Sequence, residues 1–192
     1  MTPEIVFWLE EESAEKMLRG FIPRLLPDRI TLRFRRFEGK QDMAKRLPVL
    51  MRKYQNPHAR FVVIVDQDSH PHWRDIKGKL QTLCAGIWTF PVLIRIACHE
   101  LESWYLGDLA AVERALEIPV ARYQHMKKFR KPDRLNNAKQ ELQKLTACQY
   151  RELDSAERIA PYLSLTDNYS CSFLQLVRGI QNIRDSILGT CS

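Results

Sequence analysis

The chain has 192 residues and a mass of 22.6 kDa, enough for one domain, or a domain with an appendage, with a sizeable core. Its 45% apolar and 28% charged content is ordinary for a folded protein, and no apolar stretch is long enough to span a bilayer. The formal charge of +7 and the pI near 9.3 favour a polyanionic partner.

The first half of the chain alternates between strand and helix signals. Strands are predicted where short β-branched apolar runs occur, and helices where apolar residues recur at helical spacing. In chain order these are a strand at 5–9, a helix at 13–26, an edge strand at 30–37, a helix at 41–54, a strand at 61–65, a helix at 73–84 and a strand at 92–98. This order predicts a mainly parallel sheet with helices packed against it.

Strand signals stop after residue 102, and the remaining signals are helical. Helices are predicted at 103–116, 139–145, 154–163 and 172–188. We therefore expect an α/β core over residues 1–108 and a helical C-terminal extension over residues 109–192 that packs on it as one compact unit.

Three of the predicted strands run directly into acidic residues. Glu10, Glu11 and Glu12 follow the first strand, Asp66 and Asp68 follow the 61–65 strand, and Glu100 and Glu102 follow the last. In parallel sheets, ligands bind outside the carboxyl ends of the strands. Carboxylates that converge there need cations, so the pattern predicts a divalent metal site.

Asp66 and Asp68 form a DxD motif, and in an extended strand both side chains would leave on the same face. Two carboxylates on one face suit a Mg²⁺ ion, which keeps several waters and also binds phosphate oxygens. Glu10 could ligate the ion or act as a general acid or base on a phosphodiester. The alternative is that Asp66 only caps the following helix and Asp68 is solvated.

A glutamate after the first strand and a DxD motif at the end of a later strand together resemble the Toprim fold. That fold occurs in topoisomerases, primases and the nuclease domain of overcoming-lysogenization-defect (OLD) proteins. The chain resembles a small stand-alone Toprim-related family that is described as a domain of unknown function. The resemblance covers nearly the whole chain, in the segments 9–18, 36–48, 60–70, 95–108 and 150–176.

The resemblance implies a phosphodiester site that uses one or two Mg²⁺ or Mn²⁺ ions. Glu10 would take the place of the catalytic Toprim glutamate, Asp66 and Asp68 would bind metal, and Glu100 and Glu102 would serve a second ion. The Toprim glutamate is usually followed by glycine, whereas Glu11 stands here, so which of the three glutamates acts stays open. Many OLD-type sites also carry a third acid after the DxD motif, where this chain has Ser69 and His70.

A basic segment in the second half has the composition of a nucleic-acid contact, although a charged face is often only solvated. Its basic residues are Lys127, Lys128, Arg130, Lys131 and Arg134, with Tyr123 and Phe129 interleaved. Trp104 and Tyr105 are expected in the core, where they would not stack on bases. Gly39 and Lys40 could approach a phosphate, but a simple turn is the stronger interpretation because the full P-loop pattern is missing.

Five scattered cysteines, odd in number and never in CxxC spacing, argue against a zinc ribbon or a disulfide scaffold. The chain shows neither a basic n-region nor a signal-peptide cleavage site, so we expect a cytoplasmic protein without membrane attachment.

The function expected from these features is a metal-dependent nuclease acting on DNA or RNA. The resemblance also implies a role as the effector of a phage-defence system together with an ATPase, which must be another chain because this one lacks a Walker A motif. The alternatives are a catalytically inactive Toprim-fold protein that binds nucleic acid or regulates an ATPase, and a hydrolase of a small phosphorylated ligand. The sequence leaves the oligomeric state open.

Overall fold

Four short apolar segments form a parallel sheet in the computed structural model, which describes residues 2–189. The strands are β1 (Glu4–Leu9), β2 (Thr31–Arg36), β3 (Arg60–Asp66) and β4 (Leu93–Ala97), in the order β2-β1-β3-β4. All three pairings are parallel, so every carboxyl end lies at the same edge, and Asp66 is level with Ala97. The predicted α/β class with a mainly parallel sheet flanked by helices is confirmed, as is the edge position of β2.

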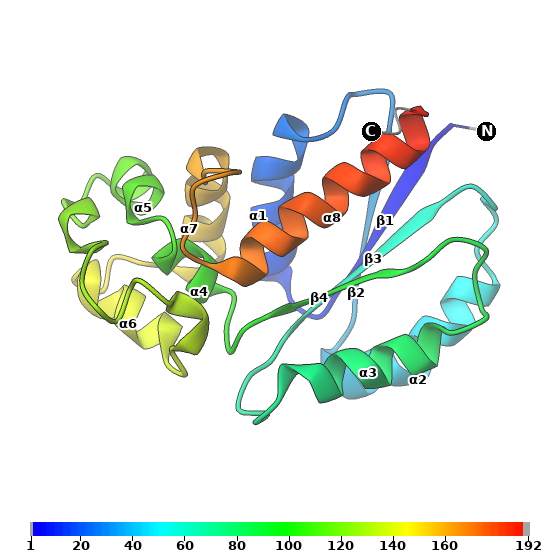
Figure 1. Ribbon diagram of the computed structural model, residues 1–192, viewed down its shortest axis with the longest axis horizontal. Helices are drawn as coiled ribbons and strands as arrows, with labels where there is room; N and C mark the ends of the chain where they lie inside the picture. The colour runs from blue at the N-terminus through cyan, green and yellow to red at the C-terminus, as the bar shows by residue number, and fades with distance from the viewer. Residues whose placement is uncertain (1, 190–192) are drawn as a thin grey trace.

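Helices cover both faces of this sheet (Figure 1). On one face, Phe7 and Ile64 pack in a core with helices α1 (Glu12–Phe21) and α8 (Cys171–Leu188). On the other, side chains such as Trp8 pack in a second core with α2 (Gly39–Arg52) and α3 (Trp73–Cys84). Strands buried on both faces need apolar residues at consecutive positions, which is why β1 and β3 read as unbroken apolar runs. The predicted helix at 73–84 is confirmed at both ends.

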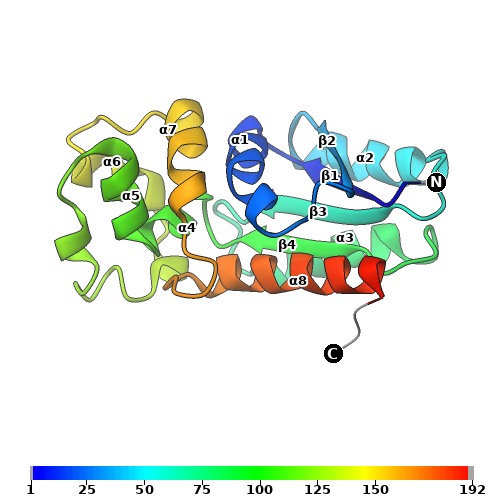
Figure 2. The ribbon, with the colours of Figure 1, turned by 90° about the horizontal axis from the view of Figure 1, so that it is seen from above.

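The remaining helices gather beyond the carboxyl end of the sheet, as Figures 1 and 2 show. They are α4 (Glu102–Leu106), α5 (Leu109–Leu116), α6 (Ala138–Leu145) and α7 (Glu152–Ile159). Four single 3₁₀ turns also occur among the described residues: η1 (Ile22–Arg24), η2 (Ala121–Tyr123), η3 (Pro132–Arg134) and η4 (Ala160–Tyr162). These helices and the α1–α8 face of the sheet share one continuous hydrophobic core. The division of the chain at residue 108 stays a prediction.

The helix predicted at 103–116 is wrong as a single element, because the chain breaks at Gly107 and Asp108. The Asp108 side chain caps α5 by accepting from the Ala111 N–H at 3.0 Å, and it also accepts from the Ser164 N–H at 2.7 Å. A Cβ atom at Gly107 would lie 2.0 Å from Asn168 Oδ1, so only glycine permits this approach. The break is therefore fixed by a segment far along the sequence.

Within residues 2–189, no helix is both long and apolar enough to cross a membrane. Cys84, Cys98, Cys148 and Cys171 are free thiols, and Cys191 lies outside the described residues.

Candidate functional site

The carboxyl edge of the sheet brings together acidic side chains from three strand ends. Glu10 follows β1, and its Oε2 accepts a hydrogen bond from the backbone N–H of Asp66 at 3.3 Å. Asp66 is the last residue of β3, and the N–H of Asp68 donates to the carbonyl of His99, just after β4, at 2.7 Å. Glu10, Asp66 and Asp68 therefore lie at one place on the sheet edge.

The turn after β3 is not a continuation of the strand. Asp68 and His99 both have left-handed backbone conformations, with φ of 52° and 61°. The expectation that Asp66 and Asp68 leave the same face of an extended strand is therefore wrong. Buried Gln67 fixes this turn, since its Nε2 donates to the His70 carbonyl at 2.7 Å. Two left-handed non-glycine residues joined by a hydrogen bond represent backbone strain of the kind that concentrates at functional sites.

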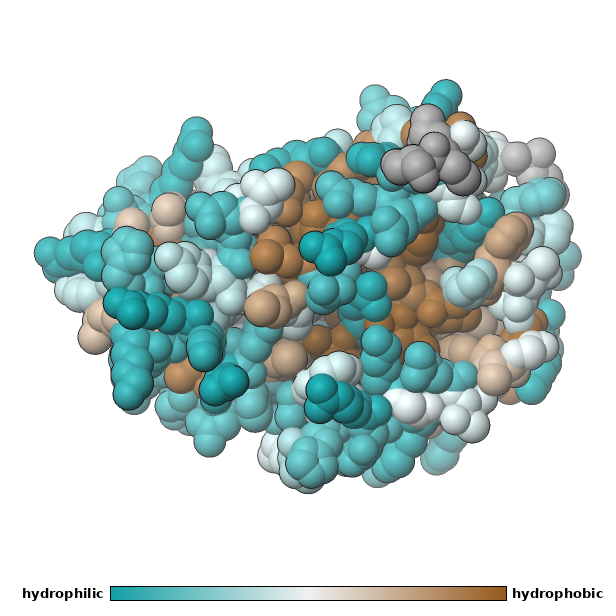
Figure 3. All heavy atoms as spheres, in the orientation of Figure 1, coloured by the Kyte–Doolittle hydropathy of each residue, from teal (hydrophilic) through white to brown (hydrophobic). Residues whose placement is uncertain are grey.

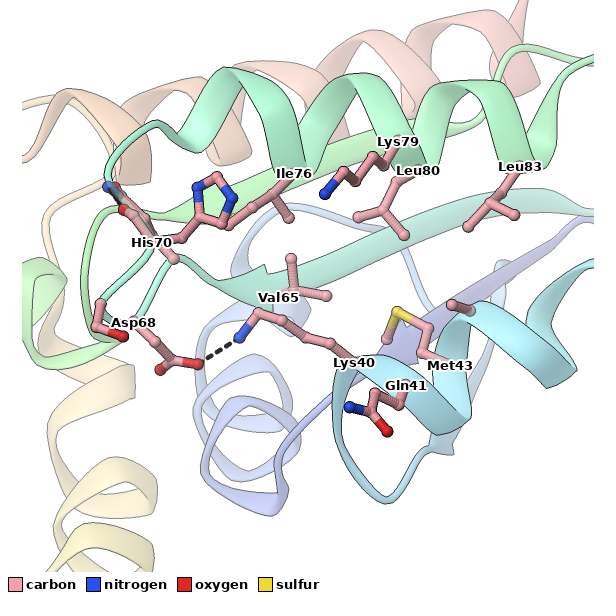
Figure 4. Close-up of a pocket in the computed structure, with 13 residues that line it drawn as sticks. Lys40, Gln41, Met43, Val65, Asp68, His70, Ile76, Lys79, Leu80 and Leu83 are labelled. Atoms are coloured by element: carbon pink, nitrogen blue, oxygen red, sulfur yellow. Dashed lines mark hydrogen bonds and ion pairs between the residues drawn. The ribbon is translucent and has the colours of Figure 1, made fainter.

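Glu10 and Asp68 form what we call the outer pair, and one lysine bridges them. The Nζ of Lys40, from α2, lies 3.1 Å from Glu10 Oε1 and 2.5 Å from Asp68 Oδ2. Figure 4 shows the Lys40–Asp68 contact. Burial raises the pKa of Glu10, although the Lys40 ammonium partly opposes this. For Lys40, burial alone would lower the pKa, but its hydrogen bonds and charge interactions with Asp68 and Glu10 raise it.

Asp66 and Glu102 form a second group, the inner cluster, together with the hydroxyls of Tyr105 and Tyr150. Asp66 Oδ2 accepts from the N–H of Leu101, the residue before α4, at 3.1 Å, whereas the alternative interpretation was that Asp66 caps the helix after β3. Burial raises the pKa of Asp66 well above its usual range, and the nearby carboxylates of Glu11, Glu102 and Glu10 raise it further. Negative charge at Asp66 is thus poorly compensated.

Glu102 is buried and its Oε1 accepts from the Tyr150 hydroxyl at 2.9 Å. Burial raises the pKa of Glu102 to about 7, although the hydrogen bond from Tyr150 partly opposes this shift. The Tyr105 hydroxyl is also buried, lies near Glu102 and Asp66, and has no hydrogen-bond partner among residues 2–189. A buried hydroxyl without a partner is costly and calls for an explanation.

Glu100 makes its hydrogen bond to α6, and not to the residues that donate hydrogen bonds to Asp66 and Glu102. Its Oε2 accepts from the backbone N–H of Lys139 in the first turn of α6 at 2.8 Å. The Lys139 side chain pairs with Glu152 of α7, and its charge reaches Glu102 and Glu11. Glu100 and Glu102, predicted to act together, therefore make their hydrogen bonds to different elements.

Among residues 2–189, no group of three or more His, Cys, Asp or Glu side chains is arranged to hold a metal ion. The donor chemistry nevertheless suits a hard divalent cation, because the acids offer carboxylate oxygens. The unpartnered Tyr105 hydroxyl and the crowded carboxylates around Asp66 are features that a cation would relieve. The site therefore fits Mg²⁺ or Mn²⁺ in its chemistry, while its acids stand in two groups.

The predicted basic segment runs over the surface near this site. The side chains of all five basic residues are exposed: Lys127, Lys128, Arg130, Lys131 and Arg134. Within the segment, η3 packs against α4, the helix that carries Glu102. Phe129 is fully buried and so cannot stack on a base. Trp104 and Tyr105 are buried as well, which confirms that they pack in the core.

Two hollows flank the site. A groove of about 490 Å³ lies between α2 and α3, with an apolar floor that includes Val65 and Leu80 and with Lys40 and Asp68 at its mouth (Figure 4). A second hollow of about 430 Å³ follows β4 between α3 and α8, where Figure 3 shows apolar side chains at the surface. Of the acids of the site, Asp68 lines the first hollow.

Sequence reasoning did not assign Lys40 or Tyr150 to the site. Lys40 has a usable signal, because the helix after β2 begins beside the carboxyl end of β1, its neighbour in the sheet. Tyr150 has none, since it lies 48 residues from the Glu102 side chain that it contacts. Glu11 was one of three glutamates among which the sequence did not identify the catalytic one. In the structure, its carboxylate is the neighbouring charge that most raises the pKa of Asp66.

The sequence matches the family model described as "Domain of unknown function (DUF4276)" over residues 9–181. No curated protein matches the sequence. Among solved structures, the fold is similar to the C-terminal region of the Burkholderia pseudomallei OLD protein, with a TM-score of 0.56 and 13% sequence identity. The match covers 93% of this chain and 97% of that one, so the relation to OLD proteins that the sequence suggested is confirmed at the level of the fold.

Proposed function

We propose that this chain, which belongs to the family described as Domain of unknown function (DUF4276), is a metal-dependent nuclease that hydrolyses phosphodiesters in DNA or RNA. The observation that carries the proposal is the meeting of Glu10, Asp66 and Asp68 at one edge of an OLD-like sheet. The formal charge of +7 supports a polyanionic substrate.

One or two divalent ions, when bound, would supply Lewis-acid stabilisation of the charge on the scissile phosphate. Asp66 and Asp68 are the proposed ligands, with Glu102 beside Asp66. Glu100 is the fourth proposed ligand, and because its Oε2 accepts from the Lys139 N–H, its Oε1 is the atom proposed to reach an ion.

Glu10 is the proposed proton acceptor or donor and also a proposed additional ligand of the ion. Its raised pKa suits proton transfer, because an acid–base group works best when its pKa is near the ambient pH. Glu11 is the alternative to Glu10, since its charge acts directly on Asp66.

The exposed basic segment is the proposed contact for the nucleic-acid backbone. Its lysines and arginines are exposed, and its η3 turn packs against α4, the helix that carries Glu102 of the inner cluster. Contacts of this kind hold phosphates without reading sequence. An ATPase partner chain and a role in phage defence remain proposals that rest on the resemblance to OLD proteins.

A second candidate function is nucleic-acid binding or regulation of an ATPase without cleavage. The observation that favours it is the lack, in residues 2–189, of a preformed three-ligand metal group. The bridge from Lys40 to both outer acids also favours it, because this ammonium already offsets part of their negative charge.

Cleavage of labelled DNA and RNA with Mn²⁺ separates the two candidates. Asp66→Ala is expected to abolish cleavage, at least a hundredfold, because it removes the central ligand. Asp28→Ala makes the same change on an exposed loop and should cleave like the wild type. Circular dichroism checks that both variants are folded. Equal cleavage by wild type and Asp66→Ala would reject the nuclease proposal, and binding without cleavage by the wild type would favour the second candidate.

A further inference from the structure

Lys40 is placed by the start of α2. Gly39 precedes it with a φ of +85°, a conformation that side chains disfavour, and a Cβ there would meet nothing within 4 Å. Glycine is therefore needed for its backbone, which turns the chain from β2 into α2. This turn brings the Lys40 side chain across the ends of β1 and β3.

The Lys40 ammonium holds the position between the two outer carboxylates. It lies within 3.1 Å of both Glu10 Oε1 and Asp68 Oδ2, and its side chain is one-third exposed. An ion that ligated these same two oxygens would have to occupy the same space, and like charges at such distances repel strongly. One cation, and not two, fits between these oxygens.

We infer that Lys40 is a built-in counter-cation that competes with the divalent metal ion for Glu10 and Asp68. This inference rests on the proposed metal site, but it concerns metal affinity and not cleavage. In the metal-free protein, Lys40 holds the two acids in place. A metal ion binds these two acids only when the ammonium has moved away. The measured affinity at this pair therefore equals the intrinsic affinity multiplied by the fraction of molecules in which Lys40 is unpaired.

The groove between α2 and α3 gives the displaced side chain a place to go. Lys40 stands at its mouth, next to Gln41 and opposite the exposed Lys79 on α3 (Figure 4). The Lys40 stem can follow the apolar floor of the groove while its ammonium stays in water, as long charged side chains commonly do. Displacement therefore needs a change of rotamer and no movement of α2.

Mn²⁺ titration of the full chain, without nucleic acid, tests this inference. Lys40→Met keeps the length of the stem and removes the charge, and it should bind Mn²⁺ roughly tenfold more tightly than the wild type. Lys40→Arg keeps a cation between the acids and should bind Mn²⁺ close to the wild-type affinity. Lys79→Met removes a charge from the same groove without touching either acid, and it should also match the wild type. Calorimetry or electron paramagnetic resonance of free Mn²⁺ gives the affinities.

A chemical readout tests displacement in the unmodified protein. Mass spectrometry after brief treatment with an amine-acetylating reagent should show Lys40 reacting several-fold faster in Mn²⁺ than in EDTA. Lys79 serves as the internal reference and should react at the same rate in both. This measurement does not depend on whether any variant folds.

Mn²⁺ affinity in Lys40→Met that is equal to or weaker than wild type would overturn the inference, as would Lys40 acetylation unchanged by Mn²⁺. The two proposals fail separately. Tighter Mn²⁺ binding by Lys40→Met in a protein that never cleaves contradicts only the nuclease proposal. Cleavage by a protein whose Lys40→Met variant binds Mn²⁺ no more tightly contradicts only the competition.

Discussion

The outer pair and the inner cluster both contain carboxylates, and Asp66 and Asp68 are only two residues apart, but the surroundings of the two groups differ. In the outer pair, an ammonium group stands between Glu10 and exposed Asp68. In the inner cluster, Asp66 and Glu102 are buried, and burial raises the pKa of both carboxyl groups. One ammonium partly balances the outer charges, whereas burial disfavours the charged forms of the inner carboxyl groups.

This difference indicates where a divalent ion would change the protein most. At the outer pair, an ion replaces a cation that is already present. At the inner cluster, it adds compensation that the Lys139 charge gives only in part, beside a Tyr105 hydroxyl that has no hydrogen-bond partner in residues 2–189. Metal affinity should therefore depend mainly on Asp66, and the outer pair should adjust that affinity through Lys40.

The largest expected effect is on the free energy of unfolding of the metal-free protein, and Glu102→Gln reveals it. Because burial raises the pKa of Glu102 from 4.5 to about 7, the folded state keeps a proton that the unfolded state has lost. The stability from this group is fully present below about pH 4.5 and is lost as the pH rises through about 7. The loss should be on the order of 3 kcal/mol. Glutamine has no such proton, so the variant should be more stable than the wild type at about pH 8.

Urea unfolding in EDTA between about pH 5 and about pH 8 measures this dependence. Glu117→Gln, at an exposed residue that directly follows α5, is the matched control and should follow the wild type. Parallel pH profiles for wild type and Glu102→Gln would mean that the inner cluster is not held by protonation, and the contrast with the outer pair would disappear.

A slightly smaller effect is expected in the thermal stabilisation that Mn²⁺ provides. At a hundred times the Kd, a ligand stabilises by about 2.7 kcal/mol, which for this chain length corresponds to a rise in Tm of roughly 5 to 10 °C. Asp66→Asn should lose this rise, although its amide oxygen can still accept from the Leu101 N–H. Asp68→Asn should keep part of the rise because the inner carboxylates remain.

Differential scanning calorimetry with Mn²⁺ and with EDTA gives these shifts. The reverse order, in which Asp68→Asn loses the stabilisation and Asp66→Asn keeps it, would place the principal ligand in the outer pair.

The smallest expected effect is on the affinity for nucleic acid, and it comes from the basic segment, which belongs to neither group. Replacing Lys127 and Lys131 together by alanine should weaken binding to nucleic acid several-fold and lower the slope of log affinity against log salt by about 1 to 2. The double variant Lys45→Ala/Lys53→Ala removes equal charge from the exposed face of α2 and its end, and should retain wild-type binding.

Fluorescence anisotropy with labelled DNA and RNA at several salt concentrations measures this change. Equal losses in the two double variants would show that only the net charge matters and that the basic segment is a solvated face.

Much of the fold could be predicted because the strands are buried on both faces. Trp8 and Phe7 are neighbours in β1 and enter different cores, so the strand is an apolar run that stands out from its surroundings. The helix at 73–84 begins and ends as predicted because its apolar residues face only one core. The helix predicted at 103–116 failed since its break depends on Asn168, whose contact with Gly107 leaves no local trace.

The site was predictable in its composition and less so in its arrangement. The acids at the three strand ends follow from parallel topology, and topology can be inferred from element order. The left-handed turn at Asp68, the Tyr150–Glu102 hydrogen bond and the Lys40 bridge depend on tertiary contacts. Spacing along the sequence therefore cannot separate the outer acids from the inner ones.

Helices α1 and α8, far apart in the sequence, meet on the same face of the sheet, where Phe21 and Phe173 lie edge to face with ring centres 5.6 Å apart. Glu10 lies two residues before the first residue of α1, so the helix that follows this acid is supported by α8. A contact between segments so far apart in the sequence closes a long loop, and that closure costs conformational entropy. Removing α8 would therefore take away support from the helix that follows Glu10, although α8 carries none of the acids of the site.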